Sequence, residues 1–245
     1  MQTLRVMILS AGLGSRMEQA GEPLPKPLVQ VLGKPLIHYP LMLIARAGFK
    51  EVIINLFHRA DEIKSTIGQK AFGVKINWLI EPQLLGTGGG IKNAQKLYPA
   101  KRWLVLNADT IIDIDLKELV NFHQKFSPLA TMVLSQVRLR KYTPILVDEL
   151  GWVKKIGTEP QEVKRSPNMY EVCYCGVQVV ESRLLDFLPE GKSQIIEQAY
   201  IPALRSKEKI LGHFLMGFWI AIDDPEAKER AERELGAKIK AVFKA

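Results

Sequence analysis

Apolar runs of strand length alternate along the first half of the chain with amphipathic stretches of helix length. The runs predict strands at Leu4–Ser10, Glu51–Leu56, Val74–Ile80, Trp103–Asn107 and Leu129–Ser135. The stretches predict helices near Leu36–Ala47, Ala60–Ile67, Gly88–Tyr98 and Leu116–Lys125. Several strands contain continuous apolar runs, which are typical of parallel strands buried on both faces. The alternation predicts an α/β fold with a doubly wound, mostly parallel, Rossmann-like sheet, in which ligands bind beyond the carboxyl ends of the strands.

The pattern changes after residue 140. Strands with turns are predicted at Thr143–Lys155 and Tyr170–Val180, with no helix between them. A helix is predicted at about Ser193–Ser206, and an apolar strand at Gly217–Ile222. A helix with acidic residues four positions ahead of basic ones follows at 223–245. Because no linker or low-complexity stretch intervenes, we expect one domain over 1–245, with an α/β half of about 1–140 and a small β-rich lobe of about 141–222.

Composition narrows the class of protein. With 47% apolar and 24% charged residues, the 245-residue chain matches globular proteins and not disordered or collagen-like ones. No apolar run reaches the roughly 20 residues of a membrane span, and no secretory signal is evident. The two cysteines, Cys173 and Cys175, stand too close for an ordinary disulfide. We therefore expect a cytoplasmic protein that binds no membrane.

The net charge of +8 favours polyanionic partners, but the densest basic run, Arg138–Lys141, is too short to predict nucleic-acid binding.

A turn that contains two glycines, Leu9-Ser10-Ala11-Gly12-Leu13-Gly14-Ser15-Arg16, follows the first predicted strand. Glycines let backbone N–H groups approach an anion closely, although such a turn alone is equally typical of an ordinary strand-to-helix connection. Ten residues after Arg16, Lys26 lies between Pro25 and Pro27, which stiffen the backbone around it. By itself this lysine would belong to a surface loop. Beside a phosphate-sized glycine turn, it is interpreted as an ammonium group aimed at an anion.

Two further motifs follow later strands. Glu81-Pro82-Gln83-Leu84-Leu85-Gly86-Thr87-Gly88-Gly89-Gly90 comes directly after Ile80. Each glycine in a helix costs about 1 kcal/mol against alanine, so we expect a flat group, such as a base or a sugar ring, to lie against this backbone. Asp109 follows a buried strand, where a carboxylate is well placed to hold a hard cation that bridges phosphates. The alternative for Asp109 is a turn or helix N-cap residue.

Five motifs, in this order and spacing, resemble the sugar-1-phosphate nucleotidyltransferase family: Leu9–Arg16, Pro25-Lys26-Pro27, Leu85–Gly89, Asn107–Asp109 and Gly217–Trp219. The resemblance covers about residues 4–235. It is strongest to short members without a C-terminal β-helix, such as N-acetylmuramate-1-phosphate uridylyltransferases and mannose-1-phosphate guanylyltransferase-like proteins. It implies a nucleotide-diphospho-sugar transferase fold, with a nucleotide-binding first half and a sugar-facing lobe. It also implies Mg²⁺-assisted transfer of a nucleotidyl group from an NTP to a sugar 1-phosphate.

The resemblance further implies residue roles. The catalytic residues would be Arg16, Lys26 and Asp109. The nucleotide would be bound by Leu9, Ala11, Gly12, Gly14, Ser15, Arg16, Glu81, Gly86 and Thr87. The sugar would be bound by Gly88, Glu159 and Gly176, and the metal by Asp109 and Asp223.

No catalytic base is needed for this chemistry. A sugar 1-phosphate has a second pKa of about 6, so its oxygen is already anionic at neutral pH. Lys26, Arg16 and Mg²⁺ would offset the repulsion between the two anions and stabilise the charge on the departing pyrophosphate. The four histidines lack ligand spacing, and we expect them to be structural.

Two positions depart from the family pattern. Gln19-Ala20-Gly21 stands where the family has Pro-Leu-Thr, which predicts a more mobile loop before Lys26. Ala221 stands where the family has a second aspartate ligand for the metal. Asp223 is the candidate replacement, because it shares a face with Ala221 if the strand continues. Asp223 could substitute only if the segment shifts or the metal binds through water. An alternative is that Asp224 simply caps the helix that begins at Pro225.

Other functions stay open on the sequence alone. Ala221 motivates a nucleotide- or sugar-binding regulatory protein of the same fold, and a glycosyltransferase of related fold would not need Lys26 between prolines. Glu81 could accept hydrogen bonds from guanine N1–H and N2–H₂, which favours GTP slightly over UTP. The sequence does not indicate the sugar. Phe214, Phe218 and Trp219 could supply the apolar contact of a homo-oligomer.

Overall fold

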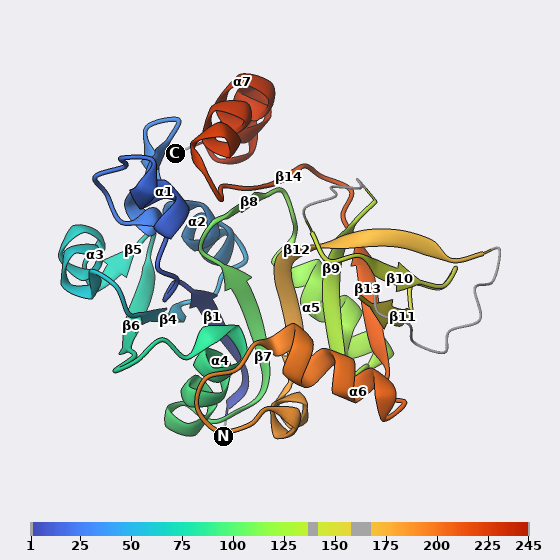
Figure 1. Cartoon of the computed structure of the whole chain (residues 1–245). Helices are drawn as coiled ribbons and strands as arrows, with labels where there is room; N and C mark the ends of the chain where they lie inside the picture. Colours follow the sequence, from blue (N-terminus) through green and yellow to red (C-terminus); the bar gives the residue numbers. More distant parts are fainter. Residues whose placement is uncertain (1, 137–141, 158–167, 245) are drawn as a thin grey trace. The chain divides into compact units, whose positions relative to one another are not determined.

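The computed structural model describes residues 2–136, 142–157 and 168–244. The chain divides into two compact units, each built from three stretches of sequence (Figure 1). Unit 1 contains Met1–Arg5, Leu85–Val105 and Lys117–Met216. Unit 2 contains Val6–Leu84, Leu106–Leu116 and Gly217–Ala245. Strands β1 (Gln2–Leu9) and β7 (Ala100–Asn107) have residues in both units.

Unit 2 is built on parallel strands. β1 pairs in parallel with β4 (Glu51–Leu56), and β4 pairs in parallel with β6 (Val74–Ile80). After Glu51, every residue of β4 is buried. The short β5 (Lys70–Ala71) is antiparallel to β6. Because β1, β4 and β6 are parallel, their carboxyl ends lie at one edge of the sheet.

Helices and short strands complete unit 2. The helices are α1 (Ser15–Gln19), α2 (His38–Arg46), α3 (Ala60–Ile67), α7 (Pro225–Val242) and the 3₁₀ turn η1 (Lys26–Leu28). Two small sheets each consist of two antiparallel strands. One is formed by β2 (Gln30–Val31) and β3 (Lys34–Pro35), and the other by β8 (Thr110–Ile112) and β14 (Trp219–Ala221).

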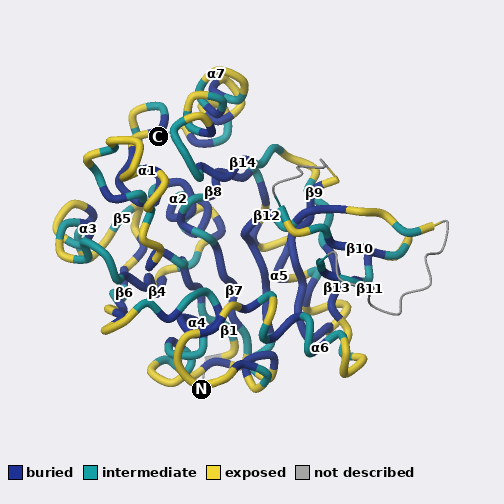
Figure 2. The backbone as a smooth tube through the Cα atoms, viewed as in Figure 1, coloured by how far each residue is buried: buried dark blue, intermediate teal, exposed yellow. Residues whose placement is uncertain are grey.

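Unit 1 is richer in antiparallel strands. β12 (Tyr170–Glu181) pairs antiparallel with β9 (Ala130–Ser135) and with β10 (Ile145–Val147). β10 also pairs with β11 (Val153–Ile156), and β13 (Ile210–Phe214) runs parallel to β9. β9 is buried along its whole length (Figure 2).

The helices of unit 1 include α4 (Gly86–Leu97) and most of α5 (Leu116–Phe126). Three shorter segments follow β12: the 3₁₀ helix η2 (Ser182–Phe187), the π-helix η3 (Ile196–Tyr200) and α6 (Ile201–Arg205). Among all the described helices, none combines the length and the apolar character that crossing a bilayer requires.

The predicted α/β fold class, with its mostly parallel sheet, is confirmed. The helix expected around Ser193–Ser206 is confirmed as a helical segment, in which the π-helical η3 continues into the short α6 and Pro202 lies in the first turn of α6. One strand of the second half was missed. β13 was not predicted, because two of its five residues, Gly212 and His213, interrupt the apolar pattern.

Candidate functional site

Four charged side chains from separate segments of unit 2 lie together. Lys26 Nζ is 2.6 Å from Asp109 Oδ2 and 3.5 Å from Asp223 Oδ1. Arg16 Nη2 is 3.8 Å from the same Asp223 oxygen. The Lys26 and Asp223 side chains are only 16% and 13% exposed, whereas Arg16 is 64% exposed. We call Arg16, Lys26, Asp109 and Asp223 the Lys26 cluster.

The β8–β14 pair brings the two carboxylates of this cluster together. Thr110 of β8 lies opposite Ala221 of β14. One step beyond, Ile222 N–H donates to the Asp109 carbonyl at 2.9 Å. Asp223 therefore follows directly after a residue bonded to Asp109, although 114 positions separate the two aspartates in the sequence.

Asp224 has a different role from Asp223, because it is the N-cap residue of α7. Its carboxylate accepts a hydrogen bond from Ala227 N–H at 2.7 Å and caps α7, with Pro225 in the first turn. The predicted cap is thus confirmed. Because Asp224 caps the helix, Asp223 is the acidic residue that faces Lys26 and Arg16.

The glycine turn and Lys26 are packed against each other. Gly14 has φ +67°, and a Cβ at this position would lie 2.9 Å from Lys26 Cβ. A side chain here would be strained and would push Lys26 away from the turn. Gly12 differs, because a Cβ there would meet no atom within 4 Å. The backbone at Gly12 therefore faces open space, as an anion-binding turn requires.

Buried polar groups tie together the carboxyl ends of β1, β4 and β6. Asn55, 2% exposed, accepts a hydrogen bond from Ser10 N–H at 2.9 Å and donates from Nδ2 to Glu81 Oε1 at 2.7 Å. Glu81 is also only 2% exposed. Sequence reasoning overlooked Asn55. The available signal was one amide in the otherwise apolar run Val52–Leu56.

In unit 1, the chain itself lies against the glycines of α4. A Cβ at Gly86 would lie 2.6 Å from the Ser193 carbonyl oxygen, and one at Gly88 would lie 2.7 Å from Leu188 Cδ2. Gly88 N–H donates to the same Ser193 carbonyl at 2.9 Å. Thr87 Oγ1 donates to Gln194 Oε1 at 2.9 Å. Residues 188–194 therefore occupy the side of α4 toward which Cβ atoms at Gly86 and Gly88 would point, and this packing accounts for the lack of side chains there. Binding of a base or sugar ring by this segment stays a prediction.

The other two predicted sugar-binding positions, Gly176 and Glu159, are not in unit 2. Gly176 has φ +78° and lies where the register of β12 against β9 shifts between Tyr174 and Gln178, so it belongs to an irregular part of this strand pair. Burial raises the pKa of the neighbouring Cys175 thiol, which makes it an unreactive core residue. Glu159 lies outside the described residues.

Of the four histidines, His123 is the one that is buried. It is fully buried, with Nδ1 2.8 Å from Thr131 Oγ1 and Nε2 3.1 Å from Glu181 Oε1. Burial lowers the pKa of His123, although its hydrogen bond to Glu181 acts in the opposite direction. Arg102 Nε also donates to Glu181, at 2.8 Å. These contacts are those of a packed polar group in the core of unit 1.

Comparison with known proteins identifies the relatives of the chain. A family model described as "Nucleotidyl transferase" matches residues 5–215. The mannose-1-phosphate guanylyltransferase catalytic subunit beta of Drosophila pseudoobscura pseudoobscura is 31% identical over 228 residues, which cover 91% of this chain and 60% of that protein. The chain thus spans about three fifths of the length of this relative.

Two further matches extend over nearly the whole of both proteins. D-glycero-alpha-D-manno-heptose 1-phosphate guanylyltransferase of Aneurinibacillus thermoaerophilus is 24% identical over 233 residues, or 95% of this chain and 98% of that protein. The crystal structure of HddC from Yersinia pseudotuberculosis complexed with GMP-PN matches with a TM-score of 0.75 at 25% identity. That match covers 94% of this chain and 99% of that one.

Proposed function

Because the chain belongs to the nucleotidyl transferase family, we propose that it transfers a nucleotidyl group from an NTP to a sugar 1-phosphate. The products are an NDP-sugar and pyrophosphate. The observation that carries this proposal is the Lys26 cluster, in which two cationic and two anionic side chains meet beside a glycine turn. Such a group of charges suits a reaction between two phosphates.

The proposed reaction is an in-line displacement at the α-phosphorus of the NTP. An anionic oxygen of the sugar 1-phosphate forms the new bond, and the bond to the β-phosphate oxygen breaks, so that pyrophosphate leaves with the electron pair. Lys26 would contact the α-phosphate and the incoming phosphate, and Arg16 the β- and γ-phosphates. The N–H groups from Ala11 to Ser15 would bind the remaining phosphate oxygens. No proton has to move.

The residues present fit a magnesium ion that arrives with the nucleotide. Within the described parts of the chain, no three His, Cys, Asp or Glu side chains are grouped so that they could hold a metal by themselves. Two carboxylates, Asp109 and Asp223, do share one cationic neighbour, Lys26 Nζ. Magnesium is usually held by one or two carboxylates together with substrate phosphates. Asp109 and Asp223 would hold the ion, which when bound neutralises phosphate charge.

For the substrates, we propose GTP and the 1-phosphate of a manno-configured sugar. The names of two relatives support this choice, since one acts on mannose 1-phosphate and the other on a manno-heptose 1-phosphate, both as guanylyltransferases. Gly176 and Glu159 remain candidates for the sugar site. Glu81 is a weaker candidate for reading the base than its position in the sequence suggests, because its carboxylate is buried and bonded to Asn55.

The test measures pyrophosphate release with Mg²⁺, four NTPs and a panel of sugar 1-phosphates. We expect release with GTP and a manno-configured 1-phosphate. Lys26→Ala should lower turnover at least tenfold. Lys64→Ala is the matched control, because Lys64 pairs with Asp61 on the surface of α3. Release with UTP alone would correct the base, whereas NTP binding without release from any pair would contradict the enzymatic proposal.

A further inference from the structure

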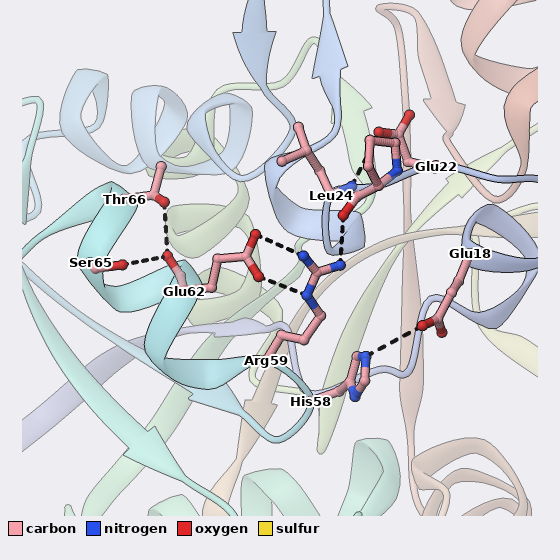
Figure 3. A network of polar contacts seen from close by, with 9 residues as sticks. Glu18, Glu22, Leu24, His58, Arg59, Glu62, Ser65 and Thr66 are labelled. Carbon is pink, nitrogen blue, oxygen red and sulfur yellow. Dashed lines mark hydrogen bonds and ion pairs between the residues drawn. The ribbon is translucent and has the colours of Figure 1, made fainter.

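The segment that carries both Arg16 and Lys26 is attached to the N-terminus of α3 through Pro23. Arg59, the N-cap residue of α3, donates from Nη1 to the Pro23 carbonyl oxygen at 2.8 Å. Pro23 lies seven residues after Arg16 and three before Lys26. Figure 3 shows the Arg59 guanidinium between Glu62 of α3 and the loop that contains Glu22 and Leu24.

The guanidinium is itself fixed in orientation. Arg59 Nε and Nη2 donate to the two oxygens of Glu62 at 2.7 and 2.8 Å (Figure 3). A two-pronged contact of this kind fixes the plane of an arginine, which an ammonium group cannot reproduce. With Nε and Nη2 held by Glu62, Nη1 is directed at Pro23.

The backbone at Arg59 is unusual for its residue type. Its φ of +51° and ψ of +37° are left-handed values, which glycine or asparagine adopts more easily than arginine. Strained backbone is retained where something else compensates for it. Here the compensation consists of three hydrogen bonds made by the side chain.

The segment between Pro23 and Lys26 is stiff, so the position of Pro23 determines the position of Lys26. Prolines occupy alternate positions in Pro23-Leu24-Pro25-Lys26-Pro27. Each proline fixes its own φ, and Pro25 is extended directly before the 3₁₀ turn that begins at Lys26, so this segment has little freedom to bend. A second, longer contact joins the same two regions, since His58 Nε2 is 3.9 Å from Glu18 Oε1 of α1.

We propose that Arg59 is a positioning residue for the phosphate site. By holding Pro23, it sets where Lys26 stands relative to Asp109 and Asp223, without touching substrate itself. This proposal rests on the proposed function for its effect on turnover. Its structural part, the attachment of the loop to α3, can be tested independently of any activity.

The first test compares three variants of α3. Arg59→Gly keeps the left-handed backbone and removes the side chain, so we expect kcat to fall about tenfold with an unchanged or higher melting temperature. Glu62→Gln should lower kcat about threefold, because the guanidinium loses its charged partner. Lys64→Ala, which disrupts only the surface pair with Asp61, should change kcat less than twofold. An unchanged kcat in folded Arg59→Gly would overturn the positioning role.

A double variant then shows whether Arg59 acts through Lys26. In the Lys26→Ala background, the further change Arg59→Gly should lower kcat less than twofold, because the group that Arg59 positions is already gone. A merely structural role predicts the same tenfold loss in both backgrounds. An additive loss in the double variant would therefore contradict the proposal.

Hydrogen exchange provides the readout that needs no substrate. The amides of Leu24 and Lys26 should exchange at least tenfold faster in Arg59→Gly than in the unmodified protein or in Lys64→Ala. If no substrate pair releases pyrophosphate, the proposed function fails. The exchange rates of the Leu24 and Lys26 amides still test whether Arg59 attaches the loop to α3. Equal exchange in all three proteins would overturn the attachment, whatever the activity.

Discussion

Replacing Lys26 with methionine removes the one cation that contacts both Asp109 and Asp223 among the described residues. Its ammonium group lies 2.6 Å from the Asp109 carboxylate. At an effective dielectric constant of about 20, two unit charges at this separation attract by about 6 kcal/mol. Desolvation and partial exposure cancel most of this, and hydrogen bonds to charged groups contribute about 1.5–3 kcal/mol net.

A divalent cation that binds Asp109 and Asp223 has to compete with this ammonium group. In Lys26→Met, the metal no longer has to displace the contact between Lys26 and Asp109, which contributes about 1.5–3 kcal/mol. Because about 1.4 kcal/mol corresponds to a factor of ten, affinity for the metal should rise about 10- to 100-fold. Turnover should fall at the same time, because Lys26 also contacts phosphate in the proposed reaction. Opposite changes in metal affinity and turnover distinguish this explanation from simple damage to the site.

The assay is titration of the nucleotide-free protein with Mn²⁺, followed by electron paramagnetic resonance of the free ion. Lys64→Met is the control for the loss of one positive charge elsewhere on unit 2. Asp223→Asn combined with Lys26→Met should abolish the gain. If folded Lys26→Met binds Mn²⁺ no more tightly than the control, the competition between ammonium and metal is refuted.

Three other predictions use matched substitutions or pH. Asp223→Asn should lower turnover at least tenfold with little change in melting temperature, whereas Asp224→Ala should lose the α7 cap and about 1 kcal/mol of stability in urea titration while keeping most turnover. Comparable effects of the two substitutions would contradict this division of roles. Gly88→Ala should destabilise the fold by about 1–3 kcal/mol through overpacking, whereas Gly12→Ala should leave stability unchanged and weaken NTP binding measured by calorimetry. A stable Gly88→Ala protein would count against the packing seen around α4. Burial lowers the pKa of His123 in the folded protein below its value of about 6.5 in the unfolded chain. At a pH between the folded and the unfolded pKa, the unfolded chain therefore binds more protons than the folded protein. Stability should therefore fall as the pH drops below about 6.5, and urea midpoints for His123→Gln should depend less on pH if His123 is responsible.

The sequence by itself determined the elements and the local chemistry. Continuous apolar runs are enough to predict buried parallel strands such as Glu51–Leu56, because burial on both faces leaves little room for polar side chains. The stiffness around Lys26 also follows locally, since each proline restricts its own φ and its predecessor. The cap at Asp224 is equally local, because the carboxylate and the N–H it accepts from are three residues apart.

Only the tertiary structure decided which distant residues meet. Asp223 contacts Lys26 because the pairing of β8 with β14 carries it next to Asp109, and no local pattern encodes that register. The glycines of α4 are explained by Leu188–Gln194, about a hundred positions away, which a sequence pattern cannot bring near them. Arg59 likewise gains its role from a carbonyl 36 positions before it. Periodicity and turn chemistry act between neighbours along the chain, whereas these contacts depend on how packed elements fill space.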